Sequence, residues 1–291
     1  MPLPAVATHI PGWTSWSFNP IIALALVAAV VTYARMYRRA SAKAATPPNA
    51  GHWVPYALGI LTLVLALFSP LDDIGDRYLL SAHMTQHELL SDIAPALLVL
   101  GLRAPILPLG LSRNALLAVA PGRRSASSRF FAIATSPWVA LPLWALATWI
   151  WAIPAVFDYA ATHSMVHVLE HTTLFYTGLA LWWLIIDPLP GARQRPNGQR
   201  LGLLGFTRVA SAFVCVPLTW LATTEYPLYA SAPRSYGLSA IADQRLAGAS
   251  MCFVEILVLG IAFVVVFINM LGRAEARMTL MESAGSPGEQ F

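Results

Sequence analysis

Charged residues are scarce in this chain: Lys, Arg, Asp and Glu make up only 11% of its 291 residues, whereas hydrophobic residues make up 57%. In ordinary soluble domains about a quarter of all residues are charged. The scarcity therefore excludes a typical soluble protein. The mean hydropathy of +0.62 indicates a chain that lies mostly within a membrane.

Cysteine is also rare, with only Cys215 and Cys252. The two lie in different apolar stretches and form no CxxC pair, which argues against a thiolate copper carrier and a disulfide enzyme. Cys252, which follows Met251, stays a remote candidate for a metal ligand. The sequence also lacks a glycine-rich nucleotide loop, a GxSxG elbow and an HExxH zinc motif, so these enzyme signatures are missing.

Long apolar runs dominate the sequence instead. A helix that crosses the hydrocarbon core of a membrane needs about 17–25 predominantly apolar residues. Seven runs of about this length predict an all-α integral membrane protein with seven transmembrane helices, at residues 20–36, 53–68, 79–102, 138–157, 165–186, 203–223 and 247–271. The chain then divides into an N-terminal segment (1–19), a transmembrane domain (20–271) and a C-terminal tail (272–291).

The Lys and Arg residues predict the orientation, because cytoplasmic loops carry an excess of them. All but three of the 18 lie in or beside the connections after the first, third and fifth runs or in the tail; the exceptions are Arg77, Arg234 and Arg245. We therefore expect a periplasmic N-terminus and a cytoplasmic C-terminus. No Lys or Arg precedes Pro20, so the first run is predicted to be a retained helix, not a cleaved signal peptide.

The net charge of +4 is explained by the same bias. Basic loops on the cytoplasmic side face the anionic lipid of the inner leaflet. Membrane lipid is therefore an expected partner, and no nucleic-acid partner is needed to account for the charge.

Five of the seven histidines lie at helical spacing: His83 and His87 in the third run, and His163, His167 and His171 before and within the fifth. An ionisable side chain is costly inside a membrane, and the usual partner of clustered imidazoles is a metal ion. Residues four apart differ by about 40° around a helix and about 6 Å along it, so each run presents one pair of imidazoles on one face. Both pairs belong to the outer half of the membrane.

The pairs His83 with His87 and His167 with His171 predict one metal site between two facing helices. For any single histidine, a hydrogen bond between helices or a part in proton transfer is the alternative. His163 lies about 12 Å along the helix axis from His171, too far to bind the same ion. We expect His163 either on the path into the site or in contact with a ligand.

Three further residues are candidates for the same site. Asp243 and Met251 stand at the outer end of the seventh run, at a similar depth, and thioether sulfur suits copper(I). For Met251, filling a gap in the core is an alternative of equal weight. Glu170 lies on the flank of the His167 and His171 face, where its carboxylate can fix an imidazole tautomer or bond to a neighbouring helix.

Glu88, Asp92 and Glu255 also lie inside predicted spans. Asp92 is about 180° around an α-helix from His83, so it cannot serve the same site unless the helix is broken. Glu255 is one turn below Met251 and either continues a polar track inward or forms a hydrogen bond between helices. The role of these acidic residues stays open.

Several motifs resemble the CtaG family of cytochrome c oxidase assembly factors. The likeness rests on residues 69–72 (SPLD), 81–87 (SAHMTQH), 163–171 (HSMVHVLEH) and 243–248 (DQRLAG), and it extends over about residues 55–271. Glu88, Ser91 and Asp92 depart from it, because such proteins usually have apolar residues there.

The resemblance implies a multi-pass protein of the bacterial inner membrane that helps to mature a haem–copper oxidase. It implies that the protein supplies copper to the catalytic subunit, with a periplasmic copper donor as a further partner. The ligand role carries over to His83, His87, His167 and His171, with Asp243 as a polar contributor. The sequence therefore predicts a membrane metallochaperone, with copper as the ion and zinc as its alternative.

Two other functions fit the histidines. Seven spans with a His-rich zinc site also describe membrane hydrolases, in which a bound water attacks a lipid amide and Glu170 or Asp243 would act as general base. Facing histidines can also bind haem iron axially. Bound copper without lipid-amide hydrolysis would favour the chaperone, and bound zinc with hydrolysis would favour the enzyme. A haem absorption spectrum would favour haem binding.

Overall fold

The computed structural model describes all of the chain except residues 1–11, 13, 120–124, 190–194 and 286–291. Within the described residues every regular element is a helix, so the predicted all-α fold is confirmed. Arg123, Arg124 and Arg193, together with most of the predicted N-terminal segment, lie outside these ranges.

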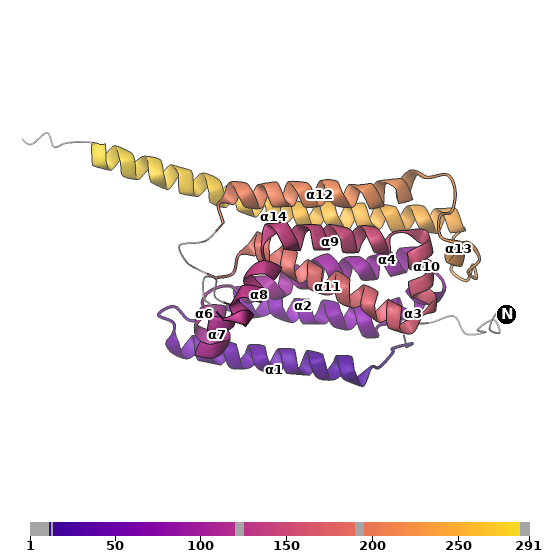
Figure 1. The fold of residues 1–291 in the computed structure, drawn as a ribbon, viewed down its shortest axis with the longest axis horizontal. Helices are drawn as coiled ribbons and strands as arrows, with labels where there is room; N and C mark the ends of the chain where they lie inside the picture. Colours follow the sequence, from indigo (N-terminus) through magenta and orange to yellow (C-terminus); the bar gives the residue numbers. More distant parts are fainter. Residues whose placement is uncertain (1–11, 13, 120–124, 190–194, 286–291) are drawn as a thin grey trace, which may run out of the picture.

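Long helices form the body of the molecule, and short helices join them (Figure 1). The long elements are α1 (Pro20–Lys43), α2 (Ala50–Phe68), α4 (Leu80–Glu88) continued by a π-helical turn (Leu89–Ile93) into α5 (Ala94–Gly101), α9 (Pro137–Trp151), α11 (Ser164–Ile186), α12 (Asn197–Trp220) and α14 (Ala240–Gly285). The short ones are α3 (Pro70–Arg77), α6 (Ile106–Gly110), α7 (Arg113–Val119), α8 (Ala126–Ala134), α10 (Pro154–Thr162) and α13 (Pro227–Ala230).

The short helices gather at the two ends of the bundle. Figure 1 shows α3, α10 and α13 at the end where α1 begins, and α6, α7 and α8 toward the opposite end, beyond which α14 projects. Local sequence explains several helix starts. Asn19 caps α1 by accepting hydrogen bonds from Ile21 and Ile22, with Pro20 at the first helical position, and Ser69 caps α3 similarly.

Four of the described helices, α1, α2, α12 and α14, are long and apolar enough to cross a membrane. The pair α8 and α9, bent by 58°, makes a fifth if the two form one span. The predicted spans 79–102 and 165–186 are helical, but the first is interrupted by the π-helical turn and the second carries His167, Glu170 and His171. The structure thus supports a membrane protein with four to five such spans, and the number seven stays a prediction.

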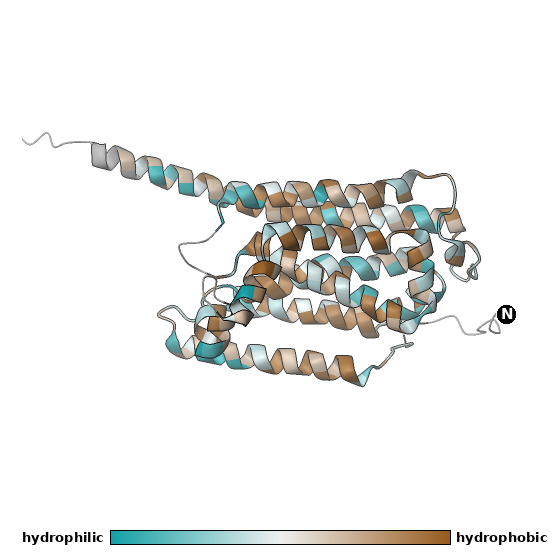
Figure 2. Cartoon of the chain, in the orientation of Figure 1, coloured by the Kyte–Doolittle hydropathy of each residue, from teal (hydrophilic) through white to brown (hydrophobic). Residues whose placement is uncertain are grey.

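Apolar side chains cover the outside of the bundle and many polar ones lie inside it, the reverse of a soluble protein. On α1, Ile21 and Leu24 are 78% and 71% exposed, and Figure 2 shows hydrophobic residues along the long helices. The buried polar residues include His83, Gln86, Glu88, Asp92, Glu170, Asp243, Gln244 and Glu255. Lipid requires this distribution of a helical bundle, because only the protein interior can satisfy polar groups.

Two close contacts fix the helices that carry these polar residues. Gly178 of α11 lies so near the π-helical turn that a Cβ at this position would be 2.1 Å from the Ser91 carbonyl oxygen. Cys215 of α12 and Cys252 of α14 form a disulfide, with their Cα atoms 5.4 Å apart. The hypothesis that Cys252 is a metal ligand is therefore wrong, because packing of α12 on α14 brings the two distant cysteines together.

Candidate metal centre

A carboxylate from α14 fixes the start of the helix that carries His83. Asp243 is completely buried, and its oxygens accept hydrogen bonds from the backbone N–H groups of Leu80 (2.7 Å) and Ser81 (3.1 Å) and from the Ser81 hydroxyl (2.6 Å). Leu79, which precedes α4, provides no side-chain cap. Asp243 supplies the cap instead, and its negative charge suits a helix N-terminus.

α3 packs directly on the backbone of His83. A Cβ at Gly75 would lie 3.1 Å from both the nitrogen and the Cα of His83, so glycine allows an approach that a larger residue would disturb. Gln86 ties α4 to the same region, because its amide donates to the Ala66 carbonyl (2.8 Å) and to Asp72 Oδ1 (2.7 Å). Contacts from α2, α3 and α14 therefore set the position of His83.

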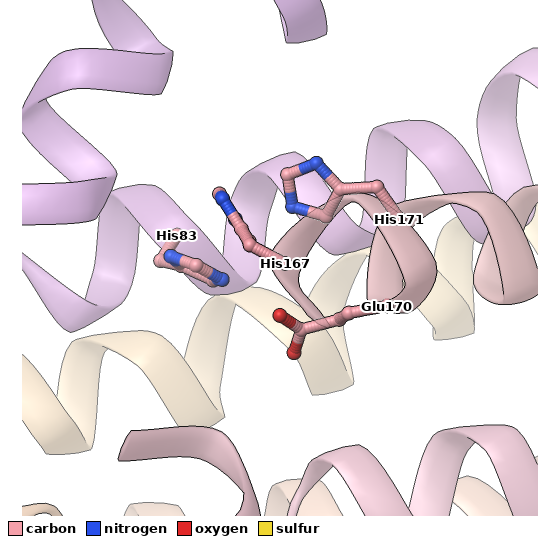
Figure 3. A group of neighbouring side chains, drawn as sticks. All are labelled: His83, His167, Glu170 and His171. Carbon is pink, nitrogen blue, oxygen red and sulfur yellow. The ribbon is translucent and has the colours of Figure 1, made fainter. Parts of the chain in front are cut away.

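Four side chains from α4 and α11 converge: His83, His167, Glu170 and His171 (Figure 3). One potential ligand atom of each lies within 4.8 Å of those of the other three. His83 and Glu170 are fully buried, whereas the His167 side chain is 16% exposed. Ligand atoms around one tetrahedral ion stand about 3.3 Å apart, so modest side-chain rotations would bring all four onto one ion.

His87 is the fifth member of this group. Its Nε2 lies 2.9 Å from Nε2 of His83 and 3.5 Å from Oε1 of Glu170. The two imidazoles of α4 thus face each other through atoms that can bind an ion. The structure brings together the four histidines with a predicted ligand role, while ligation itself stays a prediction.

Several buried polar atoms here have no hydrogen-bond partner among the described residues. They are Asp76 Oδ1, His167 Nε2, His171 Nε2 and both carboxylate oxygens of Glu170. A buried polar atom without a partner is costly, so five in one small region indicate a shared partner. A cation that binds imidazole and carboxylate fits this requirement.

Hydrogen bonds of Tyr229 determine which nitrogen of His83 is free. Its hydroxyl donates to the Gly75 carbonyl (2.5 Å) and lies 3.2 Å from Nδ1 of His83. Because the only hydroxyl proton points to Gly75, the Tyr229 oxygen can only accept from His83, and we infer that Nδ1 carries the ring proton. Nε2 then has the free lone pair, on the side that faces His87.

Sequence reasoning misses Asp76 as well as Tyr229. Asp76 Oδ1 lies 3.7 Å from His83 Nδ1 and 3.6 Å from His167 Nε2. The sequence shows only that Asp76 is an acidic residue in a connection predicted to be periplasmic. That position says nothing about its distance from a histidine.

Asp76 also holds its proton more tightly than an exposed aspartate. Burial raises the pKa of Asp76 to about 7; Asp72 and Asp73 add to the rise and Arg77 opposes it. A bound cation would favour the ionised form of this carboxyl group.

Three residues predicted for the site lie apart from the imidazoles. Asp243 caps α4, as described above. Met251 packs in an apolar cluster with Leu80 and Met84, and approaches the group only at a small cavity that His87 also borders. His163 is exposed, where its ring stacks on Tyr159 at 3.9 Å and its Nδ1 lies 2.9 Å from the carbonyl oxygen of the same residue.

An apolar exterior, a helical bundle and a buried group of imidazoles and a carboxylate define an all-helical membrane protein with a candidate metal centre. More specifically, the chain belongs to the family of cytochrome c oxidase caa3 assembly factors (Caa3_CtaG), whose family model matches residues 31–273. The likeness seen in the sequence motifs is thereby confirmed.

Three mycobacterial proteins, each named only as uncharacterized, are relatives of this chain. It is 28% identical over 257 residues to Mb0105 of Mycobacterium bovis and to MT0111 of Mycobacterium tuberculosis, and 25% identical over 257 residues to ML1998 of Mycobacterium leprae. The alignments cover 84–85% of this chain and 38% of each relative, so the chain spans well under half the length of these proteins. No solved structure matches it.

Proposed function

We propose that the protein is a metallochaperone that binds copper between α4 and α11 and assists the assembly of cytochrome c oxidase. The observation that carries this proposal is the convergence of His83, His167, Glu170 and His171 in a member of an oxidase assembly family, with five nearby buried atoms that lack a partner in the described part of the chain. His87 adds a further imidazole to the same point.

The donor set indicates the kind of ion. Imidazole nitrogens with one carboxylate oxygen suit copper(II) and zinc, whereas copper(I) favours more sulfur. Copper is the ion that a haem–copper oxidase needs in its catalytic subunit. We therefore assign copper as the ion, with zinc as the alternative.

A chaperone must also release its ion. The group offers more donors than a four-coordinate ion needs, so the ion can change partners one bond at a time. His167 and His171 are both partly exposed while His83 and Glu170 are fully buried, which makes the two α11 histidines the members that a partner protein can reach. Transfer would be a handover of the ion, with no covalent chemistry on the protein.

The positions of the site and of the basic helices at opposite ends of the bundle support a periplasmic location for the site. α3, which contacts the site through Asp76, lies at the end where α1 begins, and α6 to α8 with Arg113 and Arg129 lie toward the other (Figure 1). The positive-inside rule makes the basic end cytoplasmic. The site then faces the periplasmic side of a bacterial inner membrane, in a seven-span protein that takes copper from a periplasmic donor and passes it to the oxidase catalytic subunit.

Glu170 supports a second candidate function. Neither of its oxygens has a hydrogen-bond partner among the residues that the structure describes, and it lies beside three imidazoles, as a general base lies beside the metal ligands of a zinc hydrolase. In that case the protein would be a seven-helix membrane zinc enzyme that hydrolyses a lipid amide. Stoichiometric zinc together with hydrolysis of a fluorescent ceramide would favour this function over the chaperone.

The decisive experiment measures metal in protein purified without a His tag. His83→Ala and His167→Ala are each expected to lose most of the copper that the wild-type chain binds. His163→Ala removes an exposed histidine near the same helix start and is expected to keep it. Full copper content in the first two variants would reject the ligand assignment. In cells, His83→Ala and His167→Ala should each lower oxidase activity, and added copper should restore part of that activity.

A further inference from the structure

A second group of buried polar residues lies deeper in the bundle than the imidazoles. Glu88 ends α4, Asp92 lies in the π-helical turn and Glu255 lies on α14, and each is 3% exposed. The basic residue among them is Arg208 of α12, whose guanidinium is 3.2 Å from Oε2 of Glu255. Of the three carboxyl groups, Glu255 is the one that the structure pairs with this guanidinium.

The π-helical turn explains how Asp92 joins this group. In a regular α-helix Asp92 would point about 180° away from His83. The π-helical turn lowers the rotation per residue between Leu89 and Ile93, and Asp92 borders the same small cavity as His87. The broken helix that Asp92 requires to approach the histidines is thus present.

The side chain of Glu88 is buried. Its Oε2 has no hydrogen-bond partner among the described residues. Asp92 accepts a hydrogen bond of 2.6 Å from the Ser91 hydroxyl, and Arg208 is engaged by Glu255. A buried carboxylate with no donor and no unshared cation beside it requires another partner.

These acidic residues border a cavity of about 20 Å³, which we call the acid cavity. A cavity of this size holds about one water molecule or one ion. Its walls include Glu88, Asp92 and Glu255, and also His87 of the metal centre and the sulfur-bearing Met84 and Met251. The acid cavity and the imidazole group are therefore joined through the side chain of His87.

We propose that the acid cavity is a second position for a divalent transition-metal ion, with Glu88 and Asp92 as its main ligands, reached from the imidazole group past His87. A divalent cation bound here would favour the ionised form of the three carboxyl groups, whose charge together with Arg208 would then be two negative and would be balanced by the ion. Carboxylate oxygen, with imidazole or thioether in the same wall, is a suitable donor set for such an ion. This inference rests on the proposed function and gives the captured ion a place inside the bundle.

The test is copper(II) loading of tag-free protein, followed by metal analysis and electron paramagnetic resonance. The wild-type chain is expected to bind two copper ions, one with nitrogen couplings from imidazole and one with mainly oxygen ligands. Glu88→Gln with Asp92→Asn should remove the oxygen-type signal and halve the copper content. Glu275→Gln, which neutralises an exposed carboxylate on α14, should keep both ions.

A single substitution guards against a folding defect. Glu88→Gln keeps the shape of the side chain and leaves the Ser91–Asp92 and Arg208–Glu255 contacts in place. This single substitution should lower the affinity for the second copper ion at least tenfold and leave the melting temperature unchanged. One copper ion in the wild-type chain, with imidazole couplings that Glu88→Gln does not alter, would overturn the second position and leave the chaperone proposal standing. If His83→Ala instead keeps both copper signals, the proposed function is rejected, and this inference is rejected with it.

Discussion

Tyr229 and His83 meet beside the candidate metal centre, where the phenol oxygen lies 3.2 Å from Nδ1 of the imidazole. Since Tyr229 gives its own proton to Gly75, the pair holds His83 in the tautomer whose Nε2 can bind an ion. A residue from the short helix before α14 therefore controls the chemistry of a residue on α4. The site thus needs residues that orient the imidazoles as well as those that can bind the ion.

Tyr229→Phe tests this orienting role. The substitution keeps the ring but removes the oxygen that accepts from His83, so copper affinity should fall by about 10–100-fold while the number of ions at saturation stays the same. A competition titration with a copper chelator measures the affinity. Tyr226→Phe is the control, because the Tyr226 hydroxyl bonds to the Ala152 carbonyl and not to a histidine. An equal loss in both variants would indicate a packing effect and not the hydrogen bond.

Asp76→Asn tests the influence of a nearby negative charge. Asp76 lies 3.7 Å from His83 and 3.6 Å from His167, so its charge favours a cation bound between them. Removing that charge should weaken copper binding about tenfold, or about 1.4 kcal/mol. Asp73→Asn on the same helix disrupts only an ion pair with the largely exposed Arg77 and should change the affinity little. Unchanged affinity in Asp76→Asn would remove Asp76 from the site.

The histidine pairs were predictable from the sequence because their relation is local. Four residues separate His83 from His87 and His167 from His171, and the rise and turn of a helix convert that spacing into a shared face. Composition and the Lys and Arg positions then predict that both pairs lie toward the same end of the bundle. Spacing within a helix and the expected depth in the membrane were enough to predict that these imidazoles meet.

The neighbours of the imidazoles were not predictable in the same way. Asp243 stands at the expected depth, but depth does not reveal that the start of α4 uses both of its oxygens. Asp76 and Tyr229 come from connections, whose course depends on tertiary contacts and not on helical period. The π-helical turn likewise leaves no pattern in the residues 89–93, and the position of Asp92 depends on it.

Asp243 allows capping and ligation to be distinguished. Asp243→Ala removes the acceptor of three hydrogen bonds at the start of α4 and should destabilise the protein by about 1–3 kcal/mol and weaken copper binding. Asp243→Asn keeps one acceptor oxygen and should recover part of the stability. At saturating copper(II) the paramagnetic resonance spectrum of Asp243→Asn should match that of the wild-type chain. A changed spectrum would make Asp243 a ligand after all.

Gly178→Ala tests whether the contact between α11 and the π-helical turn holds the two halves of the site together. A Cβ there would lie 2.1 Å from the Ser91 carbonyl oxygen, so the helices must move apart, at a cost of about 1–3 kcal/mol. Because α11 carries His167 and His171, the displacement should also weaken copper binding. Gly260→Ala on α14 has nothing within 4 Å of the added carbon and should not lower the melting temperature. Equal melting temperatures in both variants would show that the close approach contributes nothing to the assembly of the site.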